Sequence, residues 1–136
     1  MGVIHKELVL RGSRGKVKVL ALFDSGASMS FVRRSVAEKL ETVLTLPEPM
    51  KFETARSGDF IIAEEVARLE FQLDGEWLSD EFLVLPDDVM SEDCIIGAKT
   101  IQAWRIVIDM ENERVYSARK VKKHMLKQAN YTKQLA

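Results

Sequence analysis

The sequence has only one cysteine, Cys94, among 136 residues, and only 3 prolines. A single cysteine cannot form an intramolecular disulfide, and it excludes most thiolate metal sites. No apolar run approaches the roughly 20 residues needed to cross a bilayer, and residues 1–6 lack the apolar stretch of a secretion signal. We therefore expect no membrane span and a reduced, cytoplasmic setting.

What is present is the composition of one globular domain, with 46% hydrophobic and 30% charged residues. The formal net charge is −1, but the last twenty residues carry six basic residues and no acidic one. This leaves 14 basic against 21 acidic residues in the first 116, a balance of −7. The step predicts a domain over residues 1–116 and a basic, helical and solvated tail over 117–136. Because the tail is short and holds one aromatic residue, we expect no nucleic-acid partner.

Apolar residues recur at every second position over most of the first 116 residues, which is the period of β-strands. The segment 17–23 starts with one polar face and ends apolar on both, so we expect it to enter the core, paired with 7–10. Asp74-Gly75 is the strongest hairpin signal, and it joins 67–73 to the returning strand 77–85. Ile106 and Ile108 pair with Val115 and Tyr116 in a third predicted hairpin.

Helical spacing is scarce. Val32, Val36 and Leu40 predict a helix of two or three turns behind Ser28 or Ser30 as N-cap, with Pro47 and Pro49 ending that region. A second short helix is expected after Gly97. The sequence therefore predicts an all-β fold class, closed as a barrel or sandwich, with one or two short helices.

One carboxylate stands at the end of an apolar strand, in Ala21-Leu22-Phe23-Asp24-Ser25-Gly26-Ala27-Ser28. Burying this charge beside Leu22 and Phe23 is costly unless hydrogen bonds satisfy it. The small residues that follow Asp24 let backbone N–H groups approach closely. Since Asp-Ser-Gly is also an ordinary turn, these residues alone leave a structural turn and a chemical site both open.

A second element, Cys94-Ile95-Ile96-Gly97, lies about seventy residues further on, with two bulky apolar residues before a glycine. Together with Asp24-Ser25-Gly26-Ala27 it resembles the retropepsins, the retroviral-type aspartic proteases, and their retrotransposon-like and cellular relatives. The resemblance covers roughly residues 17–116. It implies a closed acid-protease barrel, a homodimer, a peptide or protein substrate, and no metal or cofactor.

The resemblance also implies roles for individual residues. Asp24 would be the catalytic aspartate, Ser25 would hold the two active-site loops together across the dimer, and Gly26 would accept the close approach of substrate. Ala27 and Ser28 complete that loop, and Ile95, Ile96 and Gly97 would support it from beneath. Residues 51–64 would form the flap, a hairpin that closes over bound peptide, whose substrate-binding residues are Thr54, Ala55, Arg56, Ser57, Gly58, Asp59 and Phe60.

The chemistry requires a second carboxylate. Hydrolysis by water needs one group to remove a proton and another to donate one, and two carboxylates about 3 Å apart share a single proton and fill both roles. The chain has one Asp-Ser-Gly and no half-length repeat, so the second Asp24 must come from another copy across a twofold axis. We expect an aspartic endopeptidase with a bell-shaped pH dependence; the alternative is a catalytically silent relative that binds peptides or dimerises through the same cleft.

Other candidate sites are weaker. His5 and His124 lack metal-ligand spacing. Cys94 lies in an apolar run and is expected to be a buried hydrophobe rather than a nucleophile. The acidic segment 87–93 lacks the regular oxygen spacing of a calcium loop, so we expect it to be solvated.

Overall fold

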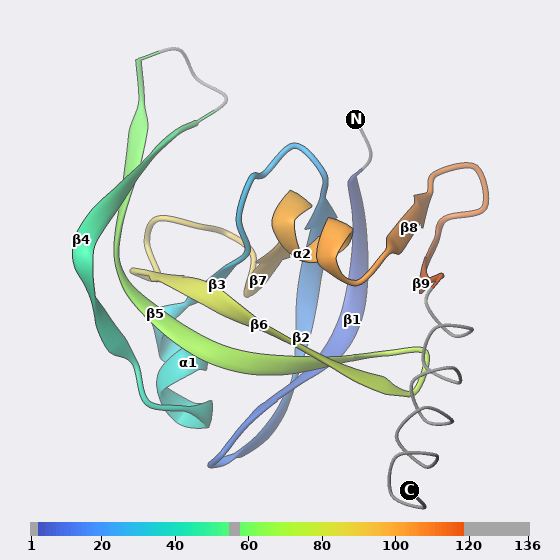
Figure 1. Ribbon diagram of the computed structural model, residues 1–136, viewed down its shortest axis with the longest axis horizontal. Helices are drawn as coiled ribbons and strands as arrows, with labels where there is room; N and C mark the ends of the chain where they lie inside the picture. The colour runs from blue at the N-terminus through green and yellow to red at the C-terminus, as the bar shows by residue number, and fades with distance from the viewer. Residues whose placement is uncertain (1–2, 55–57, 119–136) are drawn as a thin grey trace, which may run out of the picture.

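The computed structural model describes residues 3–54 and 58–118 (Figure 1). Within this part of the chain, nine strands and two short helices follow one another. They are β1 (Val3–Gly12), β2 (Gly15–Asp24), β3 (Phe31–Arg33), α1 (Arg34–Leu40), β4 (Leu44–Glu53), β5 (Phe60–Leu73), β6 (Glu76–Leu85), β7 (Cys94–Ile96), α2 (Ala98–Ala103), β8 (Ile106–Asp109) and β9 (Arg114–Ser117). Of the predicted tail over 117–136, Ser117 belongs to β9, and residues 119–136 lie outside the described residues.

Six strands close into a barrel. Their order is β1-β2-β7-β3-β6-β5, and β5 pairs back with β1 through Leu10 opposite Phe71. Strand β4 continues the sheet outside β5, while β8 and β9 form a separate two-stranded sheet. The predicted mostly-β, closed-barrel fold with two short helices is confirmed.

The three predicted hairpins are present with antiparallel register. β1 and β2 pair from Val3 opposite Asp24 to Gly12 opposite Gly15. β5 and β6 meet at a two-residue turn in which Asp74 and Gly75 have φ of 52° and 78°. Two positive φ angles are what a type I′ hairpin turn requires.

Two groups of apolar side chains fill the barrel. The larger contains Phe71 and Phe82, whose rings meet edge to face with centroids 6.3 Å apart, together with Phe23 and Ile96. The smaller lies beside β4 and β5, where the Phe31 ring meets Phe52 edge to face at 5.3 Å. The first group is the core, and the second lies under the functional site described below.

Strand β2 does not end apolar on two buried faces. Val19, Ala21 and Phe23 are buried in the barrel, but Leu20 is 49% exposed and Leu22 only half-buried. The expectation of two buried faces was wrong because no layer of the described structure covers the outer face of β2, so the alternation of burial persists to its end.

The first helix starts later than its apolar spacing predicted. Residues 31–33 form β3, which runs parallel to β6 and antiparallel to β7, and α1 begins only at Arg34. Val32 is therefore in a strand, because its backbone pairs with β6 and β7, although its spacing from Val36 and Leu40 is that of a helix. Neither Ser28 nor Ser30 is the N-cap. Instead the Asp87 carboxylate accepts the Ser35 N–H in the first turn at 3.1 Å.

The prolines also differ from expectation. α1 ends at Leu40, and Pro47 and Pro49 lie within β4, where the register with β5 shifts between Thr45 and Met50. A proline lacks the N–H of a ladder, and an outer strand with an irregular register is where this is tolerated.

None of the described helices is both long enough and apolar enough to span a membrane.

Candidate active site

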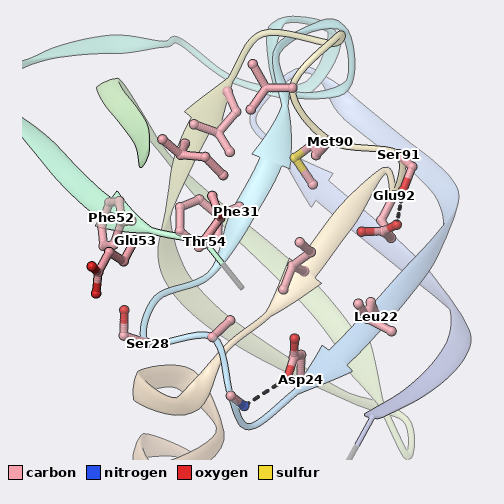
Figure 2. A pocket seen from close by; sticks show the side chains of 16 residues that line it. Leu22, Asp24, Ser28, Phe31, Phe52, Glu53, Thr54, Met90, Ser91 and Glu92 are labelled. Atoms are coloured by element: carbon pink, nitrogen blue, oxygen red, sulfur yellow. Dashed lines mark hydrogen bonds between the residues drawn. The ribbon is translucent and has the colours of Figure 1, made fainter. Parts of the chain in front are cut away.

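Asp24 is the last residue of β2, and the chain turns sharply after it. Its Oδ1 accepts the Gly26 N–H at 2.8 Å, and its backbone carbonyl accepts the Ala27 N–H at 3.1 Å (Figure 2). The side chain is half-buried and lines a cleft. The small residues after Asp24 therefore hold the carboxylate by a backbone N–H, as their sequence predicts.

The Asp24 loop rests on the segment that leads into α2. Parallel pairing of β2 with β7 sets Leu22 opposite Ile95, and Ala98 N–H donates to the Ala27 carbonyl at 2.6 Å. A Cβ on Gly97 would lie 2.1 Å from the Met29 carbonyl oxygen. Gly97 has φ of −100°, which any residue adopts, so glycine is required here for space and not for conformation.

A buried chain of hydroxyl groups joins this loop to β6, and the sequence did not reveal it. Gly97 N–H donates to Ser30 Oγ at 3.0 Å, Ser30 Oγ lies 2.5 Å from Thr100 Oγ1, and Thr100 donates to Asp80 Oδ2 at 2.6 Å. Ser30 and Thr100 are each 1% exposed. Because Thr100 donates to Asp80, its oxygen must accept the Ser30 hydrogen. The available signal was a pair of hydroxyl residues in otherwise apolar segments.

Thr100→Val should lower the free energy of unfolding by about 2 kcal/mol, because it leaves the Ser30 hydroxyl and an Asp80 oxygen without this partner. Urea denaturation measures the loss. Thr100→Ser is the matched control: it keeps the hydroxyl and removes one methyl group, for about 1 kcal/mol. A valine variant as stable as the wild type would show that the hydroxyl chain contributes nothing.

The cleft beside Asp24 has a volume of about 900 Å³. Figure 2 shows Asp24 at one end, β4 residues 52 and 53 with Thr54 on the opposite side, and residues 90–92 along a further side. Most of the lining is apolar. It comprises Leu22, Asp24, Gly26, Ala27, Ser28, Phe31, Phe52, Glu53, Thr54, Ile61, Leu85, Val89, Met90, Ser91, Glu92 and Ile95. A cleft with this lining can bury the apolar groups of a ligand.

The predicted flap corresponds to the hairpin of β4 and β5, which projects from the barrel at the upper left of Figure 1. Thr54 N–H donates to the Asp59 carbonyl at 3.1 Å, and Thr54 lines the cleft. Gly58, Asp59 and Phe60 do not line it, and the Phe60 ring is 49% exposed beneath the Lys51 ammonium at 4.0 Å. Ala55, Arg56 and Ser57 lie outside the described residues.

The predicted residues of the Asp24 loop and of its support also include some that line the cleft and some that do not. Gly26, Ala27 and Ser28 line the cleft, as does Ile95. Ser25 is exposed beside it and does not line it, while Ile96 and Gly97 are buried beneath the loop.

The structure describes two of the three remaining candidate residues, Cys94 and His5. Cys94 is fully buried, and burial raises the pKa of its thiol, so it is a hydrophobe as predicted. Exposed His5 lies on β1, and His124 is outside the described residues. The described residues contain no group of three potential metal ligands.

The acidic loop is less solvated than predicted. Hydrogen bonds from Ser35 lower the pKa of the exposed Asp87 carboxyl. Asp93 is only partly exposed, and its carboxylate accepts the Leu20 N–H at 3.2 Å. These two acids tie the loop to α1 and β2, which is why part of it is covered.

Comparisons with known proteins agree with this geometry. The family model described as aspartyl protease matches residues 10–100, well over half of the chain. The retroviral protease-like domain of Ddi1 from Leishmania major shares the fold, with a TM-score of 0.56 and 18% identity over 87% of this chain and 88% of that one. EIAV protease complexed with the inhibitor HBY-793 aligns at a TM-score of 0.45 and 15% identity, over 75% of this chain and 88% of that one. No curated protein gave a significant match.

At 18% identity the structural similarity shows only that the fold is shared, whereas the family model shows that the chain is a member of the family. The matched range includes Asp24-Ser25-Gly26 and ends three residues after Gly97, so it contains both elements of the site. The chain belongs to the aspartyl protease family and has the retropepsin-like fold.

Proposed function

We propose that this protein is an aspartic endopeptidase whose active site forms between two copies of the chain, each contributing Asp24. The observation that carries the proposal is the position of that carboxylate: it is held by the Gly26 N–H at the end of a largely apolar cleft. Family membership supports the same reaction class.

A single chain supplies half of the chemistry. The sequence has one Asp-Ser-Gly, and aspartic hydrolysis uses two carboxylates that share one proton. A twofold axis beside the Asp24 loop sets a second Asp24 opposite the first. One carboxylate then removes a proton from water while the other, protonated, donates to the substrate carbonyl oxygen.

The fold prepares the loop for this role. The Asp24 loop is fixed at Ala27 and Ser28 by the N–H groups of Ala98 and Lys99, at 2.6 and 3.1 Å. A carboxylate on a rigid, packed support loses little freedom when the reaction begins, and such preorganisation is the main source of catalysis in polar sites. The bell-shaped pH dependence stays a prediction of the shared proton.

Cleavage should depend on dimer concentration. Below the dissociation constant of the dimer, specific activity should fall roughly in proportion to total protein, because only the dimer has both carboxylates. Peptide cleavage across a dilution series, with sedimentation at the same concentrations, measures this.

The matched control joins two copies by a flexible linker, which should keep specific activity constant on dilution. A chain that sediments as a monomer and cleaves at full specific activity would contradict the two-copy site. A dimer that cleaves no peptide would favour a silent binding module instead.

A further inference from the structure

The described part of the cleft lining carries charge of one sign. It includes three acidic residues, Asp24, Glu53 and Glu92, and no basic residue. None of these three carboxylates forms an ion pair with another described residue. Walls of low polarity concentrate the field of such charges, so the cleft attracts cationic groups and repels anionic ones.

The acidic groups flank an apolar surface. Figure 2 shows Glu53 and Glu92 on opposite sides of the cleft, with Phe31 between them. Phe31, Phe52 and Met90 belong to the smaller apolar cluster, which extends under this floor. A ligand that fills the cleft therefore meets apolar contacts in its middle and a carboxylate at either side.

Glu92 is the better placed of the two glutamates. The residue after it, Asp93, is tied to β2, because the Asp93 carboxylate accepts the Leu20 N–H at 3.2 Å. Arg33 Nε donates to the Glu92 carbonyl at 3.1 Å. The Arg33 guanidinium also donates to the Ser91 carbonyl, and the Ser91 hydroxyl donates to the Glu92 carboxylate. Arg33 thus holds the backbone and leaves the Glu92 carboxylate without a basic partner among the described residues.

Glu53, by contrast, is exposed near the end of β4. It faces more water than Glu92, so its interaction with a ligand is screened more strongly. We therefore expect Glu92 to discriminate between charged and neutral ligands more strongly than Glu53.

We propose that the cleft selects peptides in which a bulky apolar side chain is flanked by lysine or arginine, and that Glu92 is the main specificity-determining residue. The inference rests on the proposed function, because it names the substrate class of the same site. An acidic flanking residue would meet repulsion in the cleft, and a neutral one would leave the carboxylate without a cationic partner.

The test uses peptides with a fixed central pair of phenylalanines and a lysine placed in turn at each of the three positions on either side. Each peptide is matched by one with norleucine, which keeps the alkyl chain and removes the charge, and by one with glutamate. The kcat/KM of the full chain should be about fivefold higher for lysine at one or more positions, as expected for a partly exposed ion pair, and lowest for glutamate.

Glu92→Gln should remove most of the lysine preference, measured as the ratio of kcat/KM for the lysine peptide to kcat/KM for the norleucine peptide. Glu53→Gln should remove a smaller part. Glu111→Gln is the matched control, because Glu111 is exposed in the β8–β9 turn and does not line the cleft. No preference for lysine, or a preference that survives Glu92→Gln, overturns the inference.

Binding separates this inference from the proposed function. The same peptides are titrated by fluorescence anisotropy into the Asp24→Asn chain with Glu92 intact or replaced by glutamine. If the wild-type chain cleaves nothing but Asp24→Asn binds lysine peptides more tightly in a Glu92-dependent manner, the proposed function fails and the inference holds. If peptides are cleaved but neither rate nor binding depends on Glu92, the inference alone fails, and if nothing is cleaved or bound, both fail.

Discussion

Asp24→Asn should abolish peptide cleavage, with a loss in kcat of about 10³-fold or more, while the protein stays folded. An amide neither takes a proton from water nor shares one with its partner. In the wild-type chain the Gly26 N–H donates to Asp24 Oδ1 at 2.8 Å. The side-chain carbonyl oxygen of the asparagine can accept the same N–H, so the loop should keep its shape. The dimer should hold or strengthen, because two crowded carboxyl groups become neutral amides.

Single-turnover peptide cleavage, circular dichroism and sedimentation measure the three expectations. Asp74→Asn is the matched control, since it makes the same chemical change in an exposed hairpin turn and asparagine suits its φ of 52°. Cleavage that survives Asp24→Asn would move the chemistry to other residues or reveal a contaminant.

Gly97→Ala should be the most destabilising single-methyl change at the site, lowering the free energy of unfolding by about 3 kcal/mol or more. The added Cβ would lie 2.1 Å from the Met29 carbonyl oxygen and 2.8 Å from that of Ala27. Both obstacles are backbone atoms of the Asp24 loop, so the loop itself must move. The variant that remains folded should also lose kcat, because displacement of the Asp24 loop by about 1 Å is enough to disturb a catalytic geometry.

Gly75→Ala is the control for backbone conformation. Nothing lies within 4 Å of a Cβ at Gly75, but its φ is +78°. That substitution should cost only about 1 kcal/mol, from the conformation alone, and leave kcat unchanged. If both variants lost the same stability, the collision at Gly97 would not be the reason for its glycine.

The sequence predicted the hairpins, whose paired strands are adjacent in the chain. Asp74-Gly75 marks one hairpin because its turn needs two positive φ angles, and the strands beside it alternate visibly. Strands β3 and β7 have three residues each and were not predicted, because their pairing partners lie far along the chain. Val32 carried a helical period that this pairing overrode.

The candidate site divides in the same way. Asp24 was noticed because a carboxylate after an apolar strand is unusual, but its role and that of Gly97 were predicted from the resemblance of their two motifs to the retropepsins. Ser30, Thr100 and Asp80 were not found, because these three polar residues meet only when the loop before β3 comes together with α2 and β6. Glu92 became informative only when the structure set it on the wall of the cleft.

The parallel pairing of β2 with β7 has a consequence for the order in which the molecule is made. Leu20 and Asp93 are 73 residues apart, whereas β1 and β2 are joined by a tight turn. Contacts over long separations form late, because the closing of a large loop costs entropy before any contact repays it.

During synthesis, the β1–β2 and β5–β6 hairpins are complete before β7 leaves the ribosome, and the gap between β2 and β3 stays open until then. The Asp24 loop therefore acquires its support last. In a growing chain of this protein the two hairpins can form early, whereas the Asp24 loop is held in place only once β7 and the start of α2 have been translated.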